Sequence, residues 1–316
     1  MYSTLTLAKN SKLTGKIVGT HQLLDQSARK ALGKLLPRGK YFPSSKEILH
    51  FEGMRGPDGL KRKSPNLDDP THMFADDQGA SLLQQIDDHY HNLIQALQSA
   101  NSTRAAFEAA WLAHKVTDAL TPAHHYPLSQ AKDELMTKKE LVKVFGEPIK
   151  GLVRGRNPLE TMRNNWLYWG VGGYLTKHIA YEYGVALLAT AMPRRRLQPR
   201  ITPDNLQPLT PRQLVHAAIA RLNPERIYAT FRAQGWTTDL AFSTRDLLLP
   251  EITKTITLIW YAAAREAYHF RTKPTKPAKP AKSPKPAKPA KSPKPPKSPK
   301  PAKPANPKTP TQSHAR

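Results

Sequence analysis

Apolar residues recur at intervals of three and four through the first 268 residues, which is the spacing of one face of an α-helix. The pattern covers residues 22–36, 81–97, 102–122, 166–192 and 251–268, and the fourth of these is interrupted by Gly170, Gly172 and Gly173. The first segment stops at Pro37, the last follows Pro250, and Ser102 is the expected N-cap of the third. No segment shows the two-residue alternation of a half-buried strand. We therefore expect an all-α body.

The last part of the chain, residues 273–316, has a different composition. It holds twelve Lys, one Arg and fourteen Pro and no acidic residue, and a lysine stands at every third position from Lys273 to Lys303. Such a segment cannot bury a core and favours polyproline II, in which a period of three aligns the lysines along one edge. We expect a disordered Lys/Pro-rich tail, whose composition resembles that of linker-histone tails.

The formal net charge of +25 is shared almost evenly between tail and body. Subtracting the tail's +13 leaves +12 for residues 1–272, and a basic body suits an anionic partner. Cysteine is absent, so any metal must be held by His, Asp and Glu. Neither a secretory signal nor a membrane-spanning run is evident, so we expect a cytoplasmic protein, free or peripheral at a membrane or the nucleoid.

The residues that indicate chemistry lie around the end of the third helical segment. His114, Asp118 and His124 follow the spacing His-x3-Asp-x5-His. The first two share a helix face, and Pro122 ends the helix so that His124 can fold back towards them. An acid in the last helical turn opposes the helix dipole, and a bound cation would resolve that conflict. The motif therefore predicts a metal site.

A family resemblance extends this set. The run from Trp111 to His124, WLAHKVTDALTPAH, resembles the core signature of the zinc-dependent phospholipase C family, whose superfamily includes single-strand-specific nucleases. That family carries a Thr-His and an Asp-x13-His before the signature and a His-x3-Glu after it. The matching residues in this chain are Thr20-His21, Asp58 with His72, and His178 with Glu182. The resemblance spans about half of the chain.

The resemblance implies a multi-helix, metal-centred bundle that binds two or three zinc ions. The first zinc site would consist of Asp58, His72, His114 and Asp118. The second would consist of His124, His178 and Glu182. His21 would join a bridging Asp118 at a third site, and Asp58 would also be the catalytic general base.

Three differences from the family bear on this assignment. The family's N-terminal tryptophan ligand has no counterpart before His21, so occupancy of the third zinc site stays open. His125 is an alternative ligand to His124, although the spacing favours His124. The interval from His124 to His178 is longer than in the secreted relatives, which implies an insertion at about residues 130–157.

We expect a phospholipase C-like helical domain over residues 1–200, further helices packed on it over 201–272, and the tail over 273–316. The leading function is zinc-dependent hydrolysis of a phosphodiester in a phospholipid head group, with the tail on an anionic membrane surface. One alternative is a zinc-dependent nuclease of the same superfamily. Another is a non-catalytic, metal-stabilised protein that binds nucleic acid through its basic tail.

Four aromatic residues precede His178. They either line a substrate cleft or belong to the core, and their helical spacing favours the core. They are Trp166, Tyr168, Trp169 and Tyr174.

Overall fold

A computed structural model of the chain describes residues 19–52, 56–58, 73–136 and 152–269. These residues form helices, turns and loops and contain no strand, which confirms the all-α prediction for the described part of the body. None of the described helices is long and apolar enough to cross a bilayer. The tail and His72 lie outside the described residues, and the predictions about them stay predictions.

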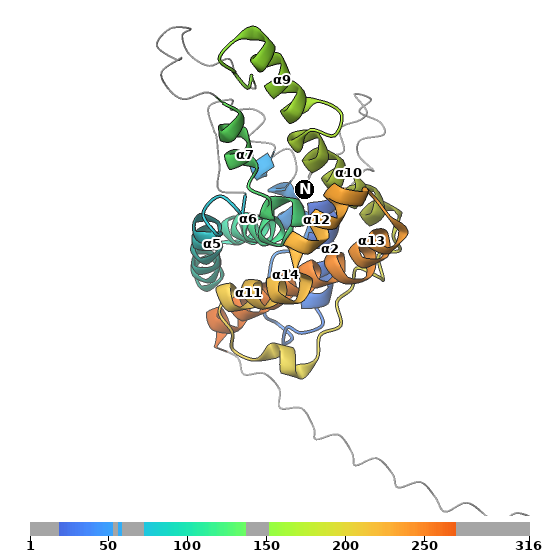
Figure 1. Cartoon of the computed structure of the whole chain (residues 1–316). Helices are drawn as coiled ribbons and strands as arrows, with labels where there is room; N and C mark the ends of the chain where they lie inside the picture. Colours follow the sequence, from blue (N-terminus) through green and yellow to red (C-terminus); the bar gives the residue numbers. More distant parts are fainter. Residues whose placement is uncertain (1–18, 53–55, 59–72, 137–151, 270–316) are drawn as a thin grey trace, which may run out of the picture. The chain divides into compact units, whose positions relative to one another are not determined.

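Figure 1 shows the described helices in chain order. In the first half they are α2 (Thr20–Leu32), α3 (Ser45–His50), α5 (Ala80–Gln98), α6 (Ser102–Leu120), η3 (Pro122–His125) and α7 (Leu128–Leu135). In the second half they are α9 (Pro158–Trp169), α10 (Tyr174–Ala191), η5 (Pro203–Leu206), α11 (Pro211–Leu222), α12 (Pro224–Gln234), α13 (Thr238–Ser243), η6 (Thr244–Leu248) and α14 (Leu249–Tyr268).

The main core forms where α14 packs against α2, α5 and α6. Trp260 of α14 is fully buried, and its indole N–H donates a hydrogen bond to the Ala109 carbonyl of α6 at 3.1 Å. Helices α5 and α6 are joined only by residues 99–101 and make the most extensive helix pair of the described chain. Helix α11 also packs on α5, α6 and α14. The helices after residue 200 therefore share the core of those before it.

One sequence prediction about a helix end is wrong in detail. The N-cap of α6 is Asn101, whose side chain accepts a hydrogen bond from the Arg104 N–H, and Ser102 is already the first helical residue. The predicted glycine interruption within residues 166–192 separates two helices, because α9 ends at Trp169 and α10 begins at Tyr174. The break contains Gly172, whose positive φ of 81° suits glycine.

Internal contacts divide the chain into one unit over residues 1–273 and a second over 274–316. This division lies next to the predicted start of the tail. The predicted insertion at residues 130–157 includes the end of α7, and residues 137–151 of it lie outside the described part.

Candidate metal centre

The end of α6 supplies the first elements of the site. His114 and Asp118 lie one turn apart and are both buried, and His114 Nε2 is 3.4 Å from Asp118 Oδ2. The helix stops at Leu120, and the short turn η3 then brings His124 back to the same end of α6. His124 Nδ1 lies 3.1 Å from the Asp118 carbonyl oxygen. The local chain path therefore gathers the His-x3-Asp-x5-His residues as the spacing predicts.

His21, Asp58 and His114 form the first of two groups whose side chains could hold a metal ion. One ligand atom from each of the three lies within 4.8 Å of the others. The imidazoles of His21, from α2, and His114 stack with their centroids 4.1 Å apart. Asp58 lies 3.6 Å from His114 Nε2 and is the most exposed of the three, with a third of its side chain open to solvent. This group joins residues that are far apart in the sequence.

His124, His178 and Glu182 form the second group, and all three are buried. Glu182 Oε1 lies 3.0 Å from His124 Nε2 and 3.1 Å from His178 Nε2. The two imidazoles are almost parallel, at an interplanar angle of 7°. Because His178 and Glu182 are one turn apart on α10, both reach the end of α6 from the same helix face. Helix α10 thus supplies two of the three donors.

Asp118 lies between the two groups. Its Oδ1 is 3.9 Å from His21 Nε2 and 3.6 Å from His124 Nδ1, while its Oδ2 faces His114. One carboxylate therefore contacts imidazoles of both groups, whereas the resemblance implied a bridge between the first zinc site and a third site at His21.

Hydrogen bonds at the Nδ1 atoms orient the imidazoles. His114 Nδ1 lies 3.1 Å from Glu52 Oε1, and His124 Nδ1 lies 3.1 Å from the Asp118 carbonyl. A partner at Nδ1 sets the tautomer and leaves Nε2 as the atom that can bind a metal. In both histidines Nε2 is the atom that faces a carboxylate of the site.

The electrostatics of the site favour cations. Burial alone would lower the pKa of His114, but the carboxylates of Glu52, Asp118 and Asp58 outweigh it and raise that pKa to about 9. Burial raises the pKa of Asp118 to about 6, although the charge of His114 opposes the rise. Burial also disfavours charged Glu182, yet His178 and the hydrogen bonds from both histidines keep the pKa of Glu182 well below its usual range. Several buried carboxylates in one site need positively charged partners.

Sequence reasoning missed two acidic residues beside the first group. Glu52 is buried and holds His114, and it lies in a loop that carries no recognisable motif. Asp25 is buried on α2, one turn after His21, and burial followed by the charge of Glu52 raises its pKa well above the usual range. The i, i+4 spacing of His21 and Asp25 was a signal that could have pointed to Asp25.

Other histidines near the site belong to neither group. His125 Nε2 donates to the Ala119 carbonyl at 2.9 Å, and its ring stacks on Phe74, so it joins neither group. His89 lies 2.6 Å from Glu108 on the α5–α6 contact. His72 lies outside the described residues, so its position relative to the first group stays a prediction.

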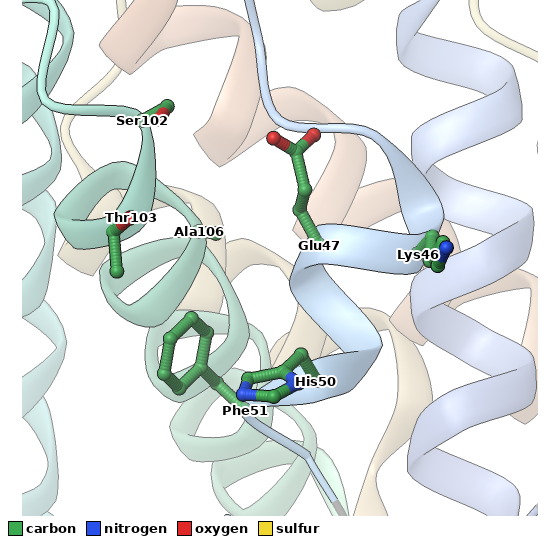
Figure 2. A pocket seen from close by; sticks show the side chains of 7 residues that line it. All are labelled: Lys46, Glu47, His50, Phe51, Ser102, Thr103 and Ala106. Atoms are coloured by element: carbon green, nitrogen blue, oxygen red, sulfur yellow. The ribbon is translucent and has the colours of Figure 1, made fainter.

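A surface hollow of about 400 Å³ lies away from the two candidate metal groups (Figure 2). It is bounded by α3 and by the first turns of α6, whereas His114 and Asp118 lie towards the other end of α6. Its lining residues are Lys46, Glu47, His50, Phe51, Ser102, Thr103 and Ala106. Figure 2 shows His50 and Phe51 at one end of this hollow and Ser102 at the other. Neither candidate metal group contributes a residue to it.

The aromatic residues before His178 do not form one core cluster. Tyr168 is buried, but Trp166 and Trp169 expose 65% and 46% of their surface. The prediction that helical spacing places them in the core is therefore wrong for these two tryptophans.

Comparison of the chain with protein-family models, with curated proteins and with solved structures finds no match. The chemical interpretation of this centre therefore rests on the geometry above and on the sequence resemblance.

Proposed function

We propose that the body is a zinc-dependent phosphodiester hydrolase. The observation that carries the proposal is the arrangement of two His/Asp/Glu groups around a single carboxylate, Asp118. A structural zinc site is usually closed by four protein ligands, whereas a catalytic site keeps an open position, and two neighbouring ions can act together on a phosphodiester.

The donor set fits zinc. Every donor is an imidazole nitrogen or a carboxylate oxygen, and both kinds bind zinc at catalytic sites, where a ligand position stays open. His21, Asp58, His114 and Asp118 would hold one ion, and His124, His178 and Glu182 another. Neighbouring zinc ions supply Lewis acidity to a phosphoryl group and lower the pKa of water.

Asp58 is the residue that we assign as general base. A base must exchange protons with water and face the reacting group, and Asp58 is the one carboxylate of the two groups that is a third exposed. Glu182 is buried against two imidazoles and is held in its charged form, which suits a ligand.

Two cations could bind the phosphate charge of a substrate; they lie on α10, which carries part of the second group, and on α12, which packs against η3 and α10. Arg232 lies over the ring of Tyr126, with its guanidinium carbon 3.9 Å from the ring centroid, and Lys177 Nζ donates to the Arg232 carbonyl. Lys177 directly precedes His178. Neither cation has a carboxylate partner among the described residues, so both are available for an anion.

Two substrate classes remain in the proposal. The resemblance to zinc-dependent phospholipase C favours a phospholipid head group. The net charge of +25 favours nucleic acid, which a basic protein attracts without reading its sequence.

The test is hydrolysis of a soluble chromogenic phosphodiester by the zinc-loaded protein. We expect activity in the wild type and a fall of at least about a hundredfold in Asp58→Asn, because proton transfer contributes about that much. Asp204→Asn is the matched control, since Asp204 is exposed and lies in η5, which supplies no residue to either group.

The same assay on phosphatidylcholine vesicles and on a single-stranded oligonucleotide separates the two substrate classes. If the protein retains its zinc but hydrolyses none of the three substrates, the proposal is contradicted. That result would favour a metal-stabilised binding protein.

A further inference from the structure

Helix α9 carries an apolar stripe on its outer face. Leu159, Met162, Trp166 and Trp169 recur at intervals of three, four and three residues, which places them on one side of the helix. Their exposed fractions are 74%, 67%, 65% and 46%. Val171, just after the helix, is 91% exposed. Large apolar side chains are usually scattered singly over a protein surface, so a continuous exposed stripe indicates a binding surface.

The inner face of α9 is firmly held, so the outer stripe is a fixed feature. Asn164 and Tyr168 are buried on this inner face. The amide of Asn164 donates to the Leu135 carbonyl of α7, and that of Asn165 donates to the Val153 carbonyl at 2.9 Å. Figure 1 shows α9 next to α7 and α10 and apart from α5, α11 and α14.

The charges around the stripe are mostly positive. Arg154, Arg156 and Arg163 lie in or beside α9, and Glu160 is the only acidic residue between positions 152 and 177. The half-buried Glu160 carboxylate accepts a hydrogen bond from the Arg156 N–H at 2.7 Å. Arg156 and Arg163 are exposed. The outer face of α9 is therefore apolar along its stripe and positive beside it.

We propose that this face of α9 binds the interface of a lipid bilayer that contains anionic lipid. Tryptophan, leucine and methionine suit the boundary between head groups and acyl chains, where an indole has both an apolar and a polar neighbour. The flanking arginines complement anionic head groups. With 12 residues α9 is too short to span a bilayer, so it would lie in the interface plane.

A second copy of the chain fits the stripe less well. A twofold contact would place the same face on both partners and bring Arg156 and Arg163 of the two copies together. Like charges buried at such a contact oppose association. An anionic lipid surface has the complementary sign.

The position of α9 also relates this surface to the metal centre. Only residues 170–173 separate α9 from α10, which carries His178 and Glu182. A bound α9 would keep the metal centre close to the head groups. The inference is independent of the proposed function, because binding to a surface requires neither zinc nor hydrolysis.

The test is co-sedimentation of the full-length protein with vesicles of phosphatidylcholine and about 30% phosphatidylserine in about 0.5 M NaCl, where the Debye length is only roughly 4 Å. These conditions suppress attraction by the lysine-rich tail and isolate the apolar face. We expect Trp166→Ser/Trp169→Ser to bind at least about tenfold more weakly than the wild type. Phe242→Ser/Leu247→Ser removes two similarly exposed apolar residues from α13 and η6 and should bind like the wild type.

Brominated lipid provides a second readout, because bromine quenches tryptophans that enter the acyl region. We expect quenching in the wild type that the α9 variant loses. Equal vesicle binding by all three proteins, or no quenching of bound wild type, would overturn the proposal. A wild-type dimer that the α9 variant converts to a monomer would overturn it too and assign the stripe to a second copy.

Discussion

His124 and His125 are adjacent in the sequence, yet their imidazoles have different surroundings. His124 Nε2 faces Glu182 at 3.0 Å, whereas His125 Nε2 is taken up by the Ala119 carbonyl. The turn η3 rotates successive side chains away from each other, and this geometry separates a candidate ligand from a packing residue.

This pair gives a matched test of the second metal group. We expect His124→Gln to lose one metal ion per chain, because the group keeps only His178 and Glu182. His125→Gln should keep the metal content of the wild type. The measurement is elemental analysis of purified protein, and loss of metal from the His125 variant alone would show that the wrong imidazole is assigned.

Glu52 is not in either group but contacts His114, and it gives a test of whether such a supporting contact affects metal binding. Its carboxylate orients His114 from Nδ1, and removal of such a partner typically weakens metal binding about 10- to 100-fold. We therefore expect a loss of that size for Glu52→Gln in competition with a chelating indicator. Glu47→Gln serves as the control, because Glu47 caps α3 instead. Unchanged affinity in Glu52→Gln would mean that His114 needs no such support.

Some residues of the site could be predicted from the sequence and others could not. His114, Asp118 and His124 are close in sequence, so helical spacing and a proline stop were enough to predict that they meet. His21 and Asp58 came only from the family resemblance, because nothing local relates them to α6. Glu52 was missed because its role depends on how a loop without a motif folds over His114.

At the scale of elements, α10 is positioned by close packing against Trp236. The indole stacks on Tyr181, the neighbour of Glu182, with ring centroids 5.3 Å apart. It also covers Gly184 so closely that a Cβ at that position would collide with it. The small residue thus allows Trp236 to hold the helix that carries His178 and Glu182.

We predict that Gly184→Ala lowers the free energy of unfolding by about 1–3 kcal/mol, the usual cost of overpacking. Alanine is the better helix former, so the same change should be neutral or stabilising by up to about 1 kcal/mol in a Trp236→Ala background. Denaturant unfolding of the four proteins measures both values. Equal effects in the two backgrounds would show that Trp236 does not constrain Gly184.

The elements were predictable where one apolar stripe faces the core. The segment at 251–268 is an example, since Ile252, Ile256 and Ile259 are buried in α14 as that pattern requires. Gly170, Gly172 and Gly173 indicated the interruption between α9 and α10, because glycine disfavours a helix interior. The stripe of α9 has the same spacing as a core face, so periodicity alone could not show that it is exposed.

For the whole molecule, the two groups connect helices that are distant in the chain. They draw residues from α2, α6, η3 and α10, together with Asp58. Without a cation, several buried carboxylates lie close together, which disfavours the compact state. Metal binding should therefore contribute to the stability of the body.

We expect chelation to lower the thermal midpoint and added zinc to restore it. Zinc at about a hundred times its Kd would contribute about 2.7 kcal/mol per site to the free energy of unfolding. Differential scanning calorimetry with and without a chelator measures the effect. Magnesium at the same concentration is the control, because it prefers all-oxygen ligands. A midpoint that does not respond to the chelator would indicate that the groups hold no metal in the folded protein.

The most direct test of the central claim is the metal content of protein purified without chelator. We expect about two zinc ions per chain in the wild type, a sharp fall in Asp118→Asn because Asp118 contacts both groups, and no change in Asp204→Asn. Absence of zinc from a folded wild type that takes up none on addition would contradict the proposed metal centre.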